Sequence, residues 1–392
     1  MLNAAQTDII KATVPLLETG GEALTTHFYK MMLGEYPEVR PLFNQAHQAS
    51  GGQPRALANG VLMYAKNIDR LEALGPLAAQ IVNKHVALQI LPEHYPIVGA
   101  CLLRAIREVL GAEIATDAVI NAWGAAYQQL ADILIGAEKS VYDKLEAAPG
   151  GWRGARPFRV ARKEAESTEI TSFYLEPVDG LAVVDFTPGQ YIGLRLVIDG
   201  QEVRRNYSLS AAANGRSYRI SVKREAGGLA SNFLHDQIQP GSVLELFPPA
   251  GAFTLQEGSS TLVLISGGVG ITPTLAMAEA ALAEGKRDVV FLHYARNRTV
   301  QGFARTLEDW AARHPRLRRF IVHEQGTAES AQALGRPDIA HLQSCLPANL
   351  DCDVYFLGPK PFMRFVKQSL AALGLPADRA NYEFFGPAEA LD

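Results

Sequence analysis

Hydrophobic and polar positions change their spacing twice along the chain of 392 residues. Residues 1–147 have apolar positions three and four apart and almost no alternation, which predicts an all-α domain. Residues 158–257 form short β-rich runs separated by turn residues, which predicts a small antiparallel β-barrel. In residues 258–392, buried-type apolar runs alternate with helical patterns, which predicts an α/β domain with an open parallel sheet. The Pro/Gly-rich stretch 148–157 is the expected linker between the first two domains.

The composition is typical of a globular protein with a large core, because 48% of the residues are hydrophobic and 20% are charged. A net charge of −4 gives no electrostatic reason to expect nucleic acid as a partner. Residues 1–13 lack the basic start and apolar core of a signal peptide, and no apolar run approaches the ~18 residues of a membrane span. The three cysteines have no metal-ligand spacing and are expected to be reduced thiols. We therefore expect a cytoplasmic protein without stable membrane association.

One histidine lies within an apolar stripe of the helical domain. Leu74, Leu77, Ile81, His85 and Leu88 share one helical face, because they are three to four residues apart. A histidine there has two explanations: its ring is bonded to a backbone carbonyl inside the core, or it ligates a metal. Neutral imidazole is the usual axial ligand of haem iron, so the second explanation predicts a haem protein.

Three further predicted helices each carry one polar group on an apolar face, namely the phenol of Tyr29, the amide of Gln53 and the carboxylate of Glu138. Taken singly, each has a structural explanation, since core tyrosines often reach a partner and a carboxylate near a helix end is often solvated. Together with the histidine, these groups are costly on inward faces unless they serve one another or a ligand. The pattern therefore favours a ligand-binding site in the helical domain.

Over roughly residues 1–140 the chain resembles the globin family. The stretch 36–44, Tyr-Pro-Glu-Val-Arg-Pro-Leu-Phe-Asn, looks like the globin corner whose phenylalanine contacts the haem, here Phe43. His85 matches the proximal histidine, so the resemblance implies haem b with His85 as the iron ligand.

The same resemblance implies functional groups on both sides of the haem. Tyr29 and Gln53 match the distal pair of bacterial globins, in which a phenol and an amide can donate hydrogen bonds to dioxygen. Leu57 would restrict the space for a second small ligand. Tyr95 and Glu138 match the two groups that hydrogen-bond around the proximal histidine, where a carboxylate increases the donor strength of the imidazole.

The barrel segment carries an ordered set of short motifs. The turn 188–191 (Pro-Gly-Gln-Tyr) is followed by 205–208 (Arg-Asn-Tyr-Ser), then by 222–225 (Val-Lys-Arg-Glu) and by 227–232, which reads Gly-Gly-x-x-Ser-Asn. Arg-x-Tyr-Ser alone is a weak motif, but its order with the others is specific. The set resembles the flavin barrel of the ferredoxin-reductase superfamily.

This resemblance implies contacts with FAD. Tyr207 and Ser208 would contact the isoalloxazine ring, Arg205 the diphosphate and Tyr191 the adenine side, and Asn206 lies in the same run. The structural alternative is that the two tyrosines are ordinary strand residues.

The segment 262–273 runs from a strand through a glycine turn into a helix. Gly268 and Gly270 allow close approach of a phosphate, and Thr272 lies where a helix N-terminus exposes N–H donors. The pattern is not G-x-G-x-x-G, and it resembles the nicotinamide site of the same reductase superfamily. The expected nucleotide contacts are Gly268, Val269, Gly270, Ile271, Thr272 and Pro273.

The C-terminal segment adds two matches to this superfamily. Leu357-Gly358-Pro359 resembles its Cys-Gly-Pro strand end, with Leu357 in place of the usual cysteine near the nicotinamide. In 382–387 the aromatic residue that covers the flavin would be Phe385, and the resemblance places further FAD contacts at Phe384, Gly386 and Pro387.

A globin followed by this reductase resembles the flavohaemoglobin family, whose characteristic activity is nitric oxide dioxygenation. The resemblance implies that NADH or NADPH reduces FAD, FAD reduces the haem iron, and nitric oxide and dioxygen become nitrate. It also implies small-molecule partners only, and we expect a monomer. Lys84 and Glu383 match positions between haem and flavin that could tune electron transfer, or they are solvated surface charges.

Several alternatives stay open at this point. The first alternative is a gas carrier or sensor without turnover, although such a protein needs no dedicated reductase. The second is an NAD(P)H reductase whose helical domain is only a cap without haem. Hydroperoxide reduction and lipid binding are further activities compatible with the family. Arg296 and Arg298 follow the second strand of the nucleotide domain, where a cation could meet a 2′-phosphate or simply be a loop charge.

Overall fold

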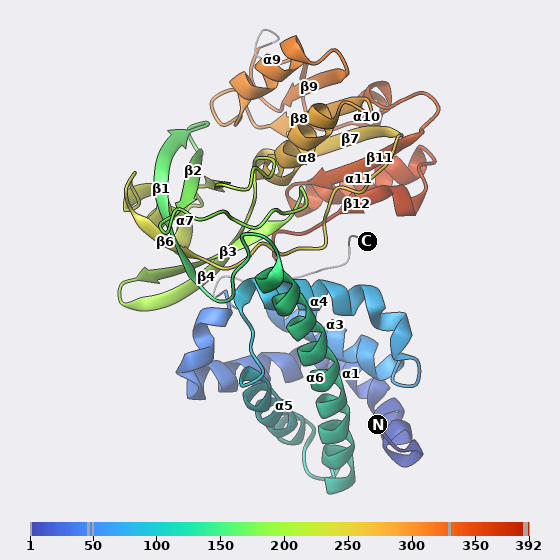
Figure 1. Cartoon of the computed structure of the whole chain (residues 1–392). Coiled ribbons are helices and arrows are strands. Elements are labelled where there is room, and N and C mark those ends of the chain that lie inside the picture. Colours follow the sequence, from blue (N-terminus) through green and yellow to red (C-terminus); the bar gives the residue numbers. More distant parts are fainter. Residues whose placement is uncertain (1, 45–47, 49–50, 328–330, 387–390, 392) are drawn as a thin grey trace. The chain divides into compact units, whose positions relative to one another are not determined.

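The computed structural model describes residues 2–44, 48, 51–327, 331–386 and 391, which divide into two compact units. One unit contains the chain up to Ala147 together with the short segment Asp199–Arg205. The other contains Ala148–Ile198 and Asn206–Phe385, in which a barrel and a parallel sheet are recognisable. Figure 1 shows both units.

The first unit is helical. Its helices are α1 (Ala4–Glu35), α3 (Gly52–Lys66), α4 (Gly75–Leu88), α5 (His94–Leu110) and α6 (Asp117–Ala147), with short 3₁₀ turns at Pro37–Leu42 and Leu71–Leu74. Phe28 and Met32 of α1 share one buried cluster with Ala105 of α5 and with Ala122 and Trp123 of α6. The alanines let the helices approach closely enough for the large side chains to fill the space between them. No helix in the described part of the chain is long and apolar enough to span a membrane.

The barrel consists of β1 (Arg156–Ala165), β2 (Ile170–Pro177), β3 (Tyr191–Ile198), β4 (Gln201–Ser208), β5 (Tyr218–Lys223) and β6 (Val243–Leu246), and it carries the helix α7 (Leu229–Asp236). The strand order is β4-β3-β6-β1-β2-β5. A bridge from Leu209, just after β4, to Ile220 in β5 joins the two ends of this order. Trp152, within the stretch expected to be a linker, is buried, and its indole N–H donates to the carbonyl of Leu246 at 3.2 Å.

The third part is a parallel sheet in the order β10-β9-β8-β7-β11-β12. Its strands are β7 (Thr261–Gly267), β8 (Val289–Ala295), β9 (Leu317–His323), β10 (Ala333–Leu334), β11 (Cys352–Leu357) and β12 (Ala380–Tyr382). Its helices are α8 (Ile271–Glu284), α9 (Ala304–Arg313), α10 (Ile339–Cys345) and α11 (Lys360–Ala372), with 3₁₀ turns at Gly268–Gly270 and Ala377–Arg379.

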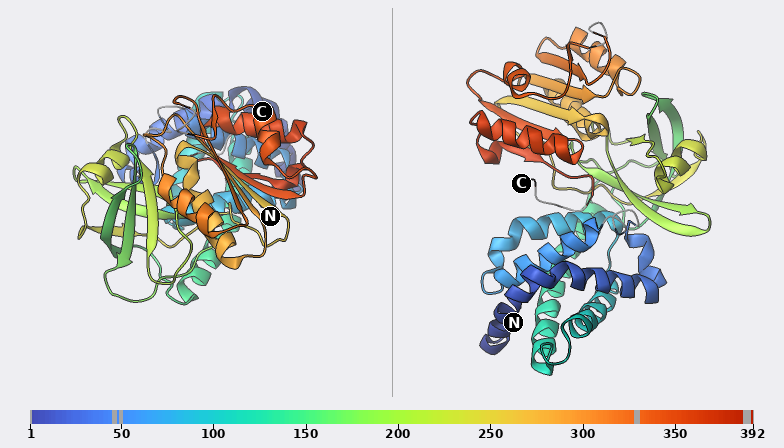
Figure 2. Two further views of the ribbon diagram at one scale, coloured as in Figure 1. Left: turned by 90° about the horizontal axis from the view of Figure 1, so that it is seen from above. Right: turned by 180° about the vertical axis from the view of Figure 1, so that it is seen from behind.

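Helices cover both faces of this sheet, as the view from above in Figure 2 shows. Leu275 of α8 and Leu307 of α9 pack on one face, and Leu342 of α10 and Val366 of α11 pack on the other. The central strands are therefore apolar on both sides, which explains their continuous hydrophobic runs. The predicted fold class, an all-α domain followed by an antiparallel barrel and an open parallel sheet, is confirmed.

Candidate functional site

The histidine in the apolar stripe is bonded to a buried carboxylate. Nδ1 of His85, on α4, lies 2.7 Å from Oε1 of Glu138 on α6. The hydroxyl of Tyr95, on α5, donates to the same oxygen at 2.6 Å and lies 3.2 Å from Nδ1 of His85. The Glu138 side chain is only 2% exposed, whereas that of His85 is 31% exposed. Three helices thus converge on one group, and the backbone-carbonyl explanation for this histidine does not apply.

This contact determines which imidazole nitrogen is available for a ligand. Since Nδ1 donates to the carboxylate of Glu138, Nε2 is the nitrogen that could bind iron. Burial and the neighbouring carboxylate raise the pKa of Tyr95, so its hydroxyl stays protonated and remains a donor at neutral pH.

Two contacts that sequence reasoning missed hold α5 and α6 in position. The hydroxyl of Tyr127 on α6 donates to the carbonyl of Tyr95 at 2.6 Å. The Tyr127 ring lies so close to Gly99 that a Cβ at position 99 would be 2.5 Å from a ring carbon. A glycine is therefore required at position 99, and its spacing from Tyr95 was the only signal available.

On the other predicted side of the site, Tyr29 is almost fully buried in α1. Its ring packs edge-to-face on Phe43, with 5.5 Å between ring centroids, and its hydroxyl is hydrogen-bonded to the side chain of Gln53. Burial raises the pKa of Tyr29, so the phenol is neutral. Oε1 of Gln53 also accepts a hydrogen bond from Nε2 of Gln48 at 3.0 Å, and Gln48 is a residue that sequence reasoning did not select.

A cavity with a mostly apolar lining lies beside Phe43 and Gln48. This cavity of about 340 Å³ is lined by Leu33, Arg40, Phe43 and Gln48. Apolar side chains that are only partly buried line the helical core nearby, among them Leu57, Val61 and Leu74. Within the described residues no cluster of three or more His, Cys, Asp or Glu could hold a bare metal ion. A single oriented imidazole among apolar side chains fits haem, because the porphyrin supplies the other iron ligands.

The barrel has a buried hydroxyl that a flavin could satisfy. Tyr191, at the start of β3, is 8% exposed, and its buried hydroxyl has no hydrogen-bond partner within the described structure. Burial and the charge of Glu383 raise its pKa, so the hydroxyl is neutral. The run Arg205, Asn206, Tyr207 and Ser208 ends the neighbouring strand β4. A buried hydroxyl without a partner costs about 1–3 kcal/mol, which a polar ligand atom would offset.

The helix α7 begins at the Gly-Gly-x-x-Ser-Asn motif. Gly227 has a φ of +71°, which favours glycine, and a Cβ on Gly228 would lie 2.6 Å from Oγ of Ser231. Nδ2 of Asn232 donates to the carbonyl of Gly228 at 2.7 Å. The first-turn N–H groups of this helix are therefore presented in a fixed frame that suits a phosphate.

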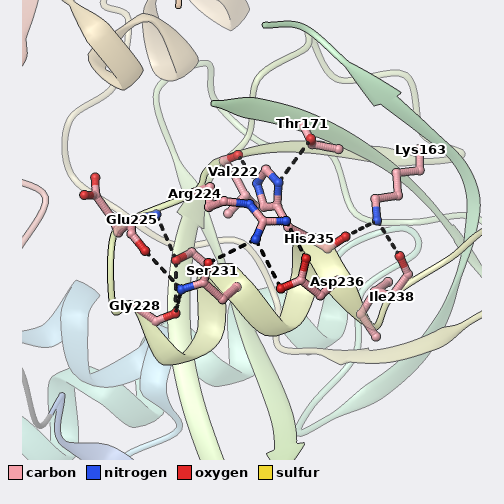
Figure 3. A network of polar contacts seen from close by, with 11 residues as sticks. Lys163, Thr171, Val222, Arg224, Glu225, Gly228, Ser231, His235, Asp236 and Ile238 are labelled. Atoms are coloured by element: carbon pink, nitrogen blue, oxygen red, sulfur yellow. Dashed lines mark hydrogen bonds and ion pairs between the residues drawn. The ribbon is translucent and has the colours of Figure 1, made fainter. Parts of the chain in front are cut away.

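Two charged side chains of the barrel segment, Lys163 and Arg224, contact the C-terminal end of α7 (Figure 3). Nζ of Lys163 donates to the carbonyls of His235 at 2.6 Å and Ile238 at 2.8 Å, next to the C-terminus of the helix. Arg224 forms an ion pair with Asp236 at 2.5 Å. These contacts hold the C-terminal end of the helix against the barrel, whereas the sequence motif covers only its glycine end.

The glycine turn after β7 is pressed against the end of β11. Gly268 has a φ of +55°, and a Cβ on Gly270 would lie 2.3 Å from the carbonyl oxygen of Leu357. The hydroxyl of Thr272 turns back to the carbonyl of Val269 at 3.0 Å. Ile271, Thr272 and Pro273 are buried, so a nucleotide would meet this turn through its backbone. Leu357 itself is buried in the core beneath α8.

Two buried histidines lie near this edge of the sheet, and sequence reasoning missed both. Nδ1 of His293, in β8, lies 2.8 Å from Oγ of Ser266 in β7. Burial lowers the pKa of His293 to about 3, so it is neutral. Nε2 of His323 in β9 lies 2.9 Å from Oε1 of Gln301.

The remaining predicted residues lie in exposed segments. Arg296 forms an ion pair with Glu169, and Arg298 lies 3.4 Å from Glu308. Phe385 is 50% exposed.

The ring of Phe384 packs at right angles to Tyr382. Gly386 has a positive φ, and Pro387 lies outside the described residues. Lys84 precedes His85 on α4, and Glu383 follows β12 in the other unit.

Comparison with known families assigns one family to each of the three parts of the chain. The globin family matches residues 26–134, the oxidoreductase FAD-binding domain matches 157–255, and the oxidoreductase NAD-binding domain matches 264–368. The fold and the sites therefore define an oxidoreductase with a haem domain and a flavin- and nicotinamide-binding reductase.

Full-length relatives make the assignment specific. The flavohemoproteins of Burkholderia sp. strain TH2 and Pseudomonas aeruginosa are 66% and 65% identical to this chain, with 100% of both sequences covered. The chain belongs to the flavohemoprotein family, which confirms the family resemblance and the three predicted cofactors, haem, FAD and a nicotinamide nucleotide.

Solved structures show the same architecture. The flavohemoglobin of Malassezia yamatoensis, with bound FAD and heme, has a TM-score of 0.87 at 26% identity and covers 98% of this chain and 100% of its own. The FAD/NAD-binding domain of the nitric oxide dioxygenase from Vibrio cholerae has a TM-score of 0.57 at 38% identity, and covers 60% of this chain and 100% of its own.

Proposed function

We propose that this chain is an NAD(P)H-dependent nitric oxide dioxygenase that converts nitric oxide and dioxygen into nitrate. The contact that carries the proposal is the bond between Nδ1 of His85 and the buried carboxylate of Glu138, in a chain that also contains a complete reductase. Such an anionic partner suits an iron that must be strongly reducing, which a simple oxygen carrier does not require. When bound, haem supplies the oxidation chemistry, and FAD converts the hydride of the nicotinamide into single electrons.

The residues of the helical domain have two tasks in this proposal. Glu138 and Tyr95 orient the imidazole of His85 and hold the Nδ1 proton on the side away from the iron. Tyr29 and Gln53 supply hydrogen-bond donors on the opposite side, where dioxygen would bind. Phe43 packs against the ring of Tyr29, and Leu57 limits the volume available to a second ligand.

The residues of the reductase bind and align two nucleotides. The N–H groups at the start of α7 would hold the flavin diphosphate, and the hydroxyl of Tyr191 would donate to FAD. The backbone of the turn 268–273 would hold the phosphates of NADH or NADPH. The FAD contacts that we assign are Tyr191, Arg205, Asn206, Tyr207, Ser208, Phe384, Phe385, Gly386 and Pro387.

We also propose that the domain limits are 1–147 for the haem domain, 158–257 for the FAD domain and 258–392 for the nucleotide domain. In this scheme Lys84 and Glu383 tune electron transfer between FAD and haem. A salt-dependent rate of haem reduction that is lost in Lys84→Ala, with an unchanged rate of flavin reduction, supports that role. An unchanged salt dependence would exclude this role for Lys84.

A spectrum and a product assay test the proposed function. The purified protein is expected to show a Soret band together with flavin absorption, and His85→Ala is expected to lose the Soret band only. With excess NAD(P)H and air, repeated additions of nitric oxide should give nitrate in catalytic amounts. Stoichiometric nitrate would instead identify a carrier or sensor, and a flavin-only spectrum would identify a reductase without haem.

We propose a cytoplasmic monomer as the working form. The three cysteines are free and buried, which suits a reducing compartment. Size-exclusion chromatography with light scattering is expected to give the mass of one chain, 42.5 kDa.

A further inference from the structure

Gln48 begins a chain of hydrogen bonds that leads into the distal side of the proposed haem site. Its Nε2 donates to Oε1 of Gln53 at 3.0 Å, and the side chain of Gln53 is hydrogen-bonded to the hydroxyl of Tyr29. Gln48 is half-buried and lines the cavity that Phe43 also lines. Among these residues only Gln48 has no role in the proposed function described above.

The direction of this chain follows from the chemistry of an amide. A glutamine side chain has an acceptor oxygen and a donor nitrogen, which lie in one plane on either side of the Cγ–Cδ bond axis. Oε1 of Gln53 accepts from Gln48, and the hydrogen bond of Gln53 to Tyr29 lowers the pKa of Tyr29, which is the effect of a donor on a phenol oxygen, so Nε2 of Gln53 is the atom that serves Tyr29. A phenol oxygen that accepts from Nε2 keeps its own hydrogen for a different acceptor.

We infer that Gln48 is a positioning residue that orients the Gln53 amide so that the hydroxyl of Tyr29 donates to a ligand on the haem iron. This inference rests on the proposed haem site and adds a residue to it. Gln48 acts only through Gln53, so removing its donor should change the hydrogen bonding of the ligand without removing the haem.

The inference predicts opposite behaviour for two side chains of similar length. In Gln48→Glu an ionised carboxylate can only accept, so the Gln53 amide should turn its Nε2 toward position 48 and its Oε1 toward Tyr29. The Tyr29 hydroxyl would then donate to Gln53 and be lost to the ligand. In Gln48→Lys a donor is retained, so the original direction should persist.

The test uses the full-length holoprotein in its ferrous state at pH 8, with carbon monoxide and dioxygen as probes. A hydrogen bond to the ligand weakens the C–O bond, so Gln48→Glu is expected to raise the C–O stretching frequency. It should also speed dioxygen dissociation by about tenfold, the effect of losing one such bond. Gln48→Lys should resemble the parent protein. Gln128→Glu, an exposed glutamine of α6, is the matched control for the charge change.

Gln48→Met removes the donor without adding charge, and it replaces Gln48→Glu in the test if the glutamate variant does not retain haem. An unchanged C–O frequency and dissociation rate in the donor-free variant would overturn the inference, as would an equal shift in Gln48→Lys. Failure of the proposed function looks different, because the parent protein itself would then form no carbon monoxide complex or no nitrate.

Discussion

Replacing Glu138 by glutamine removes one negative charge from the side chain that orients His85 and leaves its size almost unchanged. Oε1 of Glu138 accepts from Nδ1 of His85 at 2.7 Å and from the hydroxyl of Tyr95 at 2.6 Å, and the side chain is 2% exposed. Both hydrogen bonds can persist in Glu138→Gln through the amide oxygen, but they become bonds between neutral groups.

The size of the effect follows from that change. A hydrogen bond to a charged group contributes about 1.5–3 kcal/mol and one between neutral groups about 0.5–1.5 kcal/mol, so each bond should weaken by about 1–1.5 kcal/mol. The share that acts on the imidazole of His85 corresponds to about tenfold in haem affinity, since 1.4 kcal/mol is a factor of ten. This lies at the lower end of the 10–100-fold range for losing a partner of a metal ligand.

Two measurements check this prediction. Transfer of haem to an excess of an acceptor globin should be about tenfold faster in Glu138→Gln, and resonance Raman spectra of the ferrous form should show a lower iron–histidine stretching frequency. Tyr95→Phe removes only one of the two donors and keeps the carboxylate, so it should leave that frequency close to the parent value. Flavin reduction by NAD(P)H serves as an internal control and should not change. The reasoning is refuted if the glutamine variant keeps both the parent frequency and the parent rate of haem loss.

Three further changes probe the reductase. Gly270→Ala places a Cβ 2.3 Å from the Leu357 carbonyl oxygen and should slow flavin reduction by NAD(P)H at least tenfold in stopped-flow assays. The control Gly268→Ala meets no atom within 4 Å and should show only the smaller effect of backbone strain, about 1–2 kcal/mol. Equal effects of the two variants would contradict the packing argument. Tyr191→Phe should weaken FAD binding about five- to tenfold in fluorescence titrations without destabilising the apoprotein. The reason is that it removes a buried hydroxyl that has no protein partner in the described structure. An unchanged affinity for FAD would exclude a contact between this hydroxyl and FAD. The pKa of His293 falls from 6.5 to about 3 on folding, so the unfolded chain takes up a proton first as the pH is lowered. The free energy of unfolding should therefore fall below pH 6.5 by up to about 1.36 kcal/mol per pH unit. His293→Gln should reduce this slope in urea titrations between pH 7 and 5, and equal slopes in both proteins would show that the ring does not resist protonation.

Several features of this chain could be predicted from its sequence because they depend on neighbouring residues only. The spacing of Leu74, Leu77, Ile81 and His85 defines a helical face without any tertiary information. The change from helical spacing to short alternating runs and then to continuous apolar strands likewise predicts three domain types, because burial on one face or on both determines those patterns. Glycine turns such as 268–270 are also readable, since glycine adopts a positive φ at little cost and allows close contacts that a Cβ would block.

What only the tertiary structure decided is which of these groups meet and in which direction their hydrogen bonds run. His85 and Glu138 are 53 positions apart, and they touch because α4 and α6 pack at one particular rotation. Two other contacts likewise join segments that are far apart in sequence. Gly270 packs against the carbonyl of Leu357, and Lys163 donates to the carbonyl of His235 at the end of α7. Helical periodicity assigns a residue to a face, whereas a hydrogen bond requires atoms to be within about 3 Å, and that precision comes only from the packing of whole helices and strands against one another.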